Sequence, residues 1–166
     1  MTTARRKRKY YGTGLAVCVC LASALAVPAH VSRAAVTERI VVDWHSGLAI
    51  GGYDPVAFFT DSKPMPGRAD FELTYGGAVW RFCNPGNRAA FAARPDVYMP
   101  QFGGYDPFGV ARGVAVAGNP EIWLITGQRL FLFYDPARRD KFAADPDHVI
   151  AAAGRKWPDL MSTLSQ

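Results

Sequence analysis

A single stretch, residues 71–98, constrains the fold of this chain more than any other. It reads FELTYGGAVWRFCNPGNRAAFAARPDVY, with strand-forming residues on both sides of the Gly76-Gly77 pair. A Gly-Gly pair between two such runs predicts a tight β-hairpin. Asn84 can cap a helix and Pro85 suits a first helical turn, so a helix should begin there and end before Pro95. The stretch therefore predicts a complete ββα unit.

The remaining chain predicts further hairpins and short helices. A second hairpin is expected over residues 121–134, where a Gly-Gln pair separates EIWLIT from RLFLFY. Pro136 and Pro146 predict helices over residues 136–142 and 146–156, the second ended by Trp157-Pro158. We also expect a short edge strand or an extended arm at residues 37–44, a brief strand at 114–117, a helix at 56–59 and a loop at 60–69. The predicted fold class is α+β: a single compact domain of antiparallel hairpins with short helices, and the ββα unit at its centre.

The sequence GGYDP occurs twice, at residues 51–55 and 103–107. A duplicated site with two Tyr-Asp pairs is one interpretation. The residues that flank the two copies do not match, and Gly-Gly followed by Asp-Pro is common where a loop enters a helix. We therefore expect two similar loops and no internal repeat. As a helix cap alone, Asp106 would contribute about 1 kcal/mol to stability.

The positive charge of the chain is concentrated at its N-terminus. The net charge is +5 over 166 residues, but six basic residues and no acidic one precede residue 36. The rest of the chain has 13 basic and 14 acidic residues, a net charge of −1. We therefore expect no nucleic-acid partner.

Residues 1–35 have the three parts of a secretory signal peptide. A cationic start precedes an apolar run over residues 15–27 and small residues at 27–29 and 32–34, where a peptidase could cut. An apolar run of about 13 residues is shorter than the roughly 20 that span a bilayer. Cleavage would leave no membrane span, and an uncleaved anchor is the alternative. The sequence thus predicts a periplasmic or secreted domain over residues 36–166.

Cys83 is the only cysteine outside this leader, because Cys18 and Cys20 lie in the apolar run. The domain can therefore form no intramolecular disulfide, and a redox role would need a partner molecule. Cys83 is either a small buried hydrophobe or a ligand. The chain contains no GxSxG, HExxH, P-loop or GxGxxG motif. We expect no enzyme, with an enzyme of unassigned reaction as the alternative.

Several motifs in order resemble the YHS-domain family, in particular its small exported bacterial members. They lie between residues 47 and 160 and comprise GYDPVAFF, YGGAVWRFCNPGNRAAFAARPDVYMPQFGGY, a P-E-x-W segment, a hairpin similar to GKLYLNY and a closing A-x-x-x-W-P. In relatives that look metal-binding, cysteines occupy the positions of Ala57, Cys83 and Asn87. Exported relatives usually have GGYCA, with cysteine at the position of Asp106. Since three thiolates can hold zinc or copper(I) and one cannot, the resemblance implies a metal site that has changed or been lost.

These observations define the candidate site. A metal ion, copper or zinc, or a small ligand is predicted near Cys83 and Asp106, helped by Met99 or a histidine. The candidate residues are Cys83, Asp106, Tyr105, Tyr53, Asp54 and His45. The aromatic residues Tyr53, Tyr105, Phe102, Phe108 and Trp80 either line a pocket or close the core.

The function predicted from the sequence is that of an exported binding or accessory module. Its partner would be a small ligand or another protein. The alternative is a structural or interaction domain whose metal site has degenerated.

Overall fold

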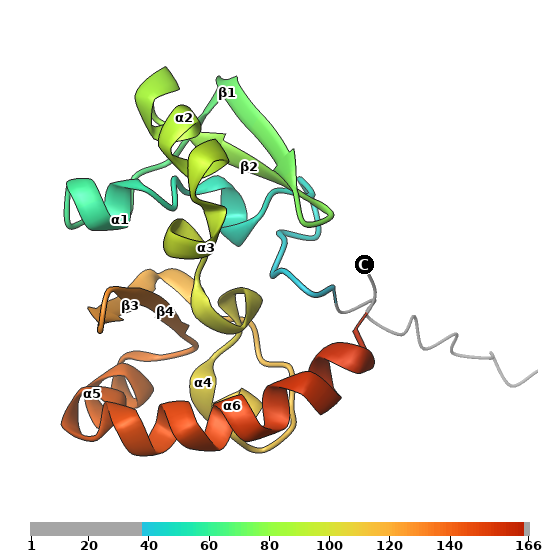
Figure 1. The fold of residues 1–166 in the computed structure, drawn as a ribbon, viewed down its shortest axis with the longest axis vertical. Coiled ribbons are helices and arrows are strands. Elements are labelled where there is room, and N and C mark those ends of the chain that lie inside the picture. Colours follow the sequence, from blue (N-terminus) through green and yellow to red (C-terminus); the bar gives the residue numbers. More distant parts are fainter. Residues whose placement is uncertain (1–37, 165–166) are drawn as a thin grey trace, which may run out of the picture. The chain divides into compact units, whose positions relative to one another are not determined.

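The computed structural model describes residues 38–164, so the predicted signal peptide lies outside the described residues. Helices and two antiparallel two-stranded sheets occur together, which confirms the α+β fold class. The elements, in chain order, are η1 (Ile50–Gly52), α1 (Ala57–Thr60), β1 (Arg68–Tyr75), β2 (Ala78–Phe82), α2 (Pro85–Ala93), α3 (Pro95–Tyr98), η2 (Gln101–Gly104), α4 (Pro107–Ala111), β3 (Asn119–Thr126), β4 (Arg129–Phe133), α5 (Pro136–Ala144) and α6 (Pro146–Ser162) (Figure 1). Both predicted hairpins, and the helix that follows each of them, are present.

The same motif occurs twice, so the expectation of no internal repeat is wrong. Each copy consists of a GGYDP loop, a short helix, a hairpin and two helices that begin with proline. We call residues 51–98 the first half and residues 103–162 the second half. The green and the yellow-to-red parts of the ribbon in Figure 1 show these two copies.

The strand registers show how closely the halves correspond. Each hairpin contains a shift in its ladder at the same place. The pairs on either side of the shift are Arg68 with Phe82 and Glu72 with Arg81 in the first half, and Asn119 with Phe133 and Trp123 with Leu132 in the second. A spacing of 51 residues relates each paired residue of the first hairpin to its counterpart in the second. A β-bulge is a specific local irregularity of a strand pair. Its recurrence at corresponding positions of the two hairpins identifies the halves as structural repeats.

Helix packing repeats in the same way. In each half, one buried phenylalanine of the helix after the hairpin packs on two aromatic rings of the second strand. The ring centroids are 5.0 and 5.3 Å apart for Phe91 with Trp80 and Phe82, and 4.9 and 5.0 Å apart for Phe142 with Phe131 and Phe133.

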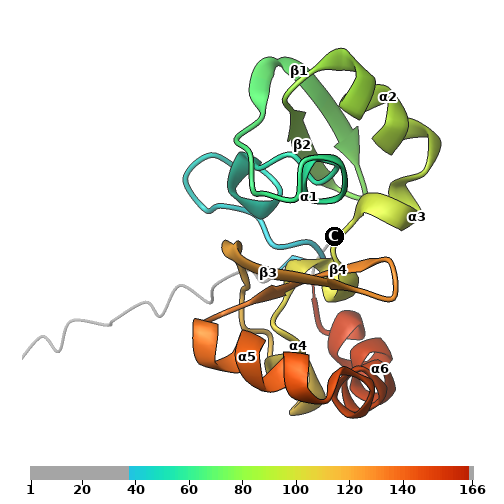
Figure 2. The same cartoon turned by 90° about the vertical axis from the view of Figure 1, so that its left-hand side faces the viewer.

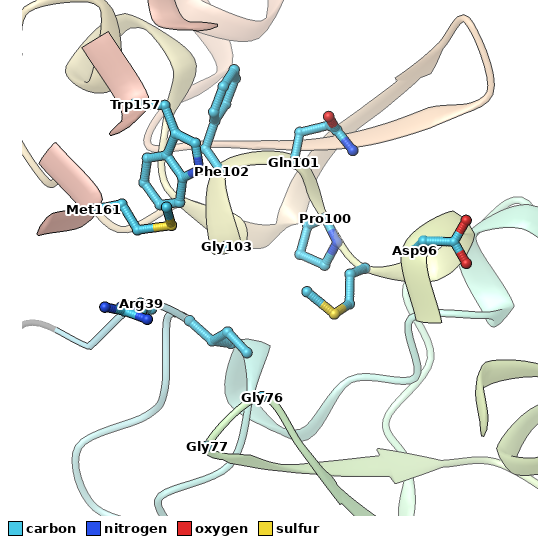
Figure 3. Close-up of a pocket in the computed structure, with 12 residues that line it drawn as sticks. Arg39, Gly76, Gly77, Asp96, Pro100, Gln101, Phe102, Gly103, Trp157 and Met161 are labelled. Atoms are coloured by element: carbon cyan, nitrogen blue, oxygen red, sulfur yellow. The ribbon is translucent and has the colours of Figure 1, made fainter. Parts of the chain in front are cut away.

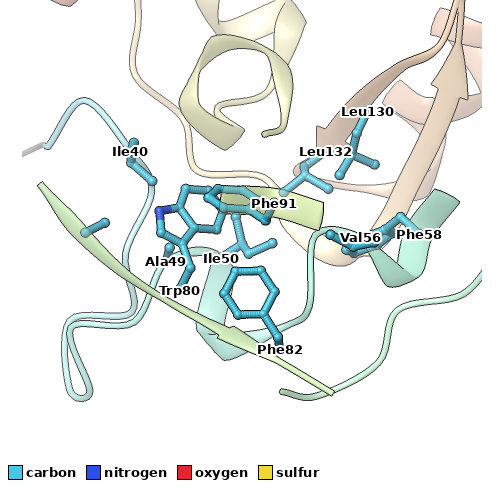
Figure 4. Packing of buried hydrophobic residues seen from close by; sticks show 11 residues of the cluster. Ile40, Ala49, Ile50, Val56, Phe58, Trp80, Phe82, Phe91, Leu130 and Leu132 are labelled. Atoms are coloured by element: carbon cyan, nitrogen blue, oxygen red, sulfur yellow. The ribbon is translucent and has the colours of Figure 1, made fainter. Parts of the chain in front are cut away.

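Strand β4 is buried on both of its faces and connects the two halves. Leu130 and Leu132 belong to the cluster that contains Ile50, Trp80 and Phe91 (Figure 4). The alternate residues, Phe131 and Phe133, pack instead with Phe142 and Val149. Figure 2 shows the β3–β4 hairpin between the first half and helices α5 and α6. The core of the first half is therefore completed by side chains of the second.

Two local predictions are wrong. Residues 114–117 form no strand, because Ala117 makes only an isolated bridge. Of the two alternatives for residues 37–44, the strand is not formed over the described residues 38–44, where Val42 makes only an isolated bridge. Helix α6 does not end at Trp157-Pro158 but continues to Ser162. A proline inside a helix destabilises it by about 3 kcal/mol, and burial of one leucine side chain stabilises the fold by about 1.5–3 kcal/mol. Leu160 and Leu164 are both buried beyond this proline, so the continued helix is favoured.

Candidate functional site

Asp54 is a buried carboxylate in the first half, with no exposed surface. One oxygen accepts hydrogen bonds from the backbone N–H of Val56 at 2.8 Å and of Ala57 at 3.3 Å. The other accepts from the backbone N–H of Cys83 at 2.8 Å and from the Asn87 side-chain amide at 2.7 Å. The carboxylate thus connects the GGYDP loop, the end of β2 and the first turn of α2.

Asp106 has the same position in the second half and is also fully buried. It accepts hydrogen bonds from the backbone N–H of Gly109 at 2.9 Å and of Tyr134 at 3.0 Å. The Arg138 guanidinium donates to it at 3.0 Å and forms an ion pair. Tyr134 and Arg138 correspond to Cys83 and Asn87 at the spacing of 51 residues. Both aspartates are therefore internal structural connections whose oxygens are already occupied.

The six candidate residues lie in three places. Cys83 and Tyr53 are near Asp54 in the first half, Tyr105 adjoins Asp106 in the second, and His45 is exposed in a separate turn. Among the described residues, Cys83 and Asp106 have different hydrogen-bond partners and form no cluster with a histidine. Within residues 38–164, no group of three or more His, Cys, Asp or Glu residues is placed to hold a metal ion.

The two tyrosines hold neighbouring segments together. The Tyr53 hydroxyl donates to the Glu121 carboxylate at 2.8 Å, and this bond raises the pKa of Tyr53. The Tyr105 hydroxyl donates to the backbone carbonyl of Glu38. Burial, and then the charge of Glu38, raise the pKa of Tyr105 to about 12. Both phenols therefore stay protonated at neutral pH and serve as hydrogen-bond donors.

The positions of Ala57, Cys83 and Asn87 converge, since all three contact Asp54. Cys83 alone supplies a sulfur atom, and its thiol donates a weak hydrogen bond to the Pro66 carbonyl at 3.5 Å. Burial, and then the Asp54 carboxylate, raise the pKa of the Cys83 thiol to about 11. The group is thus a protonated thiol at neutral pH, a poor nucleophile and a poor metal ligand.

We expect iodoacetamide to alkylate Cys83 on the order of tenfold more slowly in the native protein than in urea at about pH 8. An unfolded cysteine has a pKa of about 8.5 and so a larger thiolate fraction. The greater nucleophilicity of the more basic thiolate offsets only part of this difference. Quantitative mass spectrometry of the peptide that contains Cys83 measures both rates. Equal rates would show that the thiol is not suppressed by its surroundings.

A cavity of about 550 Å³ lies away from both aspartates. It is lined by the N-terminal segment (Arg39, Ile40), the β1–β2 turn (Gly76, Gly77), the segment from α3 through η2 (Asp96, Met99, Pro100, Gln101, Phe102, Gly103) and α6 (Trp157, Met161) (Figure 3). We call it the Arg39 cavity. Its walls are mainly apolar, and its volume lies in the range of small-molecule sites.

Arg39 is the distinctive polar group of this cavity. Its Nε atom is buried and has no hydrogen-bond partner among residues 38–164. A buried donor without an acceptor costs about 1–3 kcal/mol. Arg39 lines the cavity and forms no ion pair among residues 38–164, so its guanidinium is suited to pair with a bound anion.

A second cavity of about 510 Å³ lies over helices α4, α5 and α6, with Phe108, Lys141 and His148 in its lining. The aromatic residues that the sequence suggested as pocket residues therefore lie in different parts of the fold. Phe102 lines the Arg39 cavity and Phe108 the second cavity, while Trp80 and Tyr105 are buried in the core.

Sequence reasoning missed Arg39, Trp157 and Met161 as site residues. Arg39 lay in a segment interpreted as an edge strand, and the other two lay at an expected helix end. No local motif marks them, because the cavity is assembled from four segments that are distant in the sequence.

Comparison with protein-family models, with curated proteins and with solved structures finds no match for this chain. Within residues 38–164, none of the helices combines the length and the apolar character needed to cross a bilayer.

Proposed function

We propose that this chain is an exported binding module that holds a small molecule in the Arg39 cavity. The observation that supports this function best is the cavity itself: about 550 Å³, mainly apolar, and lined by Arg39, which forms no ion pair among residues 38–164. Cavities that combine apolar walls with a few fixed polar groups are typical of ligand sites. Export is proposed from the leader sequence, which lies outside the described residues.

A second candidate is an interaction domain of the YHS family with a degenerate metal site. It is favoured by the convergence of Ala57, Cys83 and Asn87 on Asp54, where relatives that look metal-binding would bring three cysteines together. Here one suppressed thiol, one methyl group and one amide occupy these positions. Such a set cannot hold zinc or copper(I) in the same manner.

Amide NMR spectra of the ¹⁵N-labelled chain test the first candidate. We expect millimolar 2-naphthoate, 2-naphthamide or 2-naphthylmethylamine to shift the Trp157 indole N–H and the amides of Gly76, Gly77 and Gly103. The amides of α5, at the second cavity, serve as the control. The absence of shifts around the Arg39 cavity with all three compounds would contradict a ligand site there. The same spectra test the second candidate. When zinc or copper(I) is added instead of the naphthyl compounds, the chemical shift of the Cys83 amide should not change. A change in that shift would contradict a degenerate metal site.

A further inference from the structure

We infer that the Arg39 cavity selects an amphipathic anion, in which a carboxylate or a similar planar anionic group is attached to an aromatic or aliphatic body. This inference rests on the proposed function and names the class of ligand for the same cavity.

The charge balance of the lining favours an anion. Arg39 and Asp96 are its two charged residues. Asp96 already forms an ion pair with Arg94 at 3.1 Å, and the hydrogen bond from Arg94 lowers the pKa of the Asp96 carboxyl. None of the ion pairs formed among residues 38–164 involves Arg39. The cavity therefore has a positive charge that no described carboxylate neutralises.

The local backbone fixes the position of Arg39. The Val41 N–H donates to the Gly103 carbonyl at 2.8 Å, so the Arg39 segment runs directly against η2. Gly103 has a φ of +63°, and a Cβ atom there would collide with the Arg39 carbonyl oxygen. Because only glycine allows this approach, the backbone of Arg39 is held against η2 before any ligand binds.

A carboxylate matches the hydrogen bonds that Arg39 lacks. The guanidinium presents parallel N–H donors that a carboxylate can accept in pairs. None of the ion pairs among the described residues uses this guanidinium, so a carboxylate in the cavity would supply the negative charge that it lacks. A neutral ligand of the same shape would leave the charge uncompensated.

The opposite walls suit an apolar body. Figure 3 shows Trp157 and Met161 of α6 near Phe102. The Trp157 and Phe102 rings are 5.8 Å apart at an angle of 68°. Met99 and Met161 add unbranched side chains that can adapt to a bound surface. A ligand would therefore direct its anionic group to Arg39 and its apolar body to these walls.

Two isosteric probes test the inference with the full chain. The dissociation constants of 2-naphthoate and 2-naphthamide are measured from the Trp157 indole shift for the wild type, Arg39→Gln, Arg39→Lys and the control Arg112→Gln. Arg112 is an exposed residue outside the cavity. We expect naphthoate to bind the wild type and Arg112→Gln at least about tenfold more tightly than naphthamide. Arg39→Gln should abolish this preference by weakening the binding of naphthoate, and Arg39→Lys should retain only part of it, since lysine lacks the planar fork.

The outcomes separate the inference from the proposed function. Equal binding of both probes to the wild type would overturn the anion preference and leave a ligand site in place. A preference for naphthoate that survives Arg39→Gln would also overturn the inference, because another cation would be responsible. No binding of either probe would overturn the inference, and it would contradict the proposed function as well if 2-naphthylmethylamine also failed to bind. Unfolding of each variant in urea verifies that Arg39→Gln remains folded, and Arg39→Lys provides a second variant if it does not.

Discussion

Replacement of Asp106 by alanine is expected to lower the free energy of unfolding by about 3 kcal/mol. The change leaves the buried backbone N–H of Gly109 and the partly buried N–H of Tyr134 without an acceptor, and it removes the ion pair with Arg138. Each orphaned buried donor costs about 1–3 kcal/mol, so the loss exceeds the 1 kcal/mol or so of a helix cap alone. Urea unfolding followed by circular dichroism measures it.

Asp145→Ala is the matched control for this prediction. Asp145 also caps a helix, by accepting from the His148 N–H at 3.3 Å, but it is exposed and makes no long-range connection. Asp145→Ala should lower the free energy of unfolding by about 1 kcal/mol. Equal losses for Asp106→Ala and Asp145→Ala would mean that the hydrogen bonds to Tyr134 and Arg138 contribute nothing to stability. Asp54→Ala, the same change in the first half, should resemble Asp106→Ala.

A methyl group at Gly118 should destabilise the protein by about 3 kcal/mol or more. A Cβ atom at this position would lie 2.6 Å from the Leu132 Cβ and 2.7 Å from the Gly104 carbonyl oxygen. Strand β4 is buried on both faces, so it cannot shift to relieve the steric clash with the added methyl group. Thermal and urea unfolding of Gly118→Ala measure the effect.

Gly154→Ala provides the same chemical change with the opposite expected sign. Gly154 lies exposed inside α6, and a Cβ atom there would meet nothing within 4 Å. Alanine is favoured over glycine in a helix interior by about 0.5–1 kcal/mol, so this variant should be more stable than the wild type. A Gly118→Ala protein with wild-type stability would contradict the tight approach between this segment and β4.

Much of the fold could be predicted because its signals are local. The Gly76-Gly77 pair and Asn84-Pro85 define the first hairpin and helix within a few residues of where they act. The roles of Asp54 and Asp106 could be predicted only in part. Their caps are local, whereas the bonds to the backbone of Cys83 and Tyr134 join residues 29 and 28 positions away. Those bonds exist only after the hairpins have packed.

The internal repeat was missed although the sequence contains it. When the two GGYDP loops are aligned, at a spacing of 52 residues, the residues after them do not match, because the segments that follow the loops differ in length. The helical segments correspond at 51 residues: Pro85, Arg88, Phe91, Ala92, Ala93, Pro95 and Asp96 recur as Pro136, Arg139, Phe142, Ala143, Ala144, Pro146 and Asp147. The Arg39 cavity left no such signal, because its lining comes together only through tertiary packing.

The unequal length of helices α3 and α6 bears on the stoichiometry of binding. At a spacing of 51 residues, the end of α3 at Tyr98 corresponds to Val149, so α6 from residue 150 onward has no counterpart in the first half. Trp157 and Met161 both belong to this added part. The chain thus contains two copies of the scaffold, and the longer last helix of the second copy forms a cavity wall that the first copy lacks. We therefore expect the Arg39 cavity to take up one ligand molecule per chain.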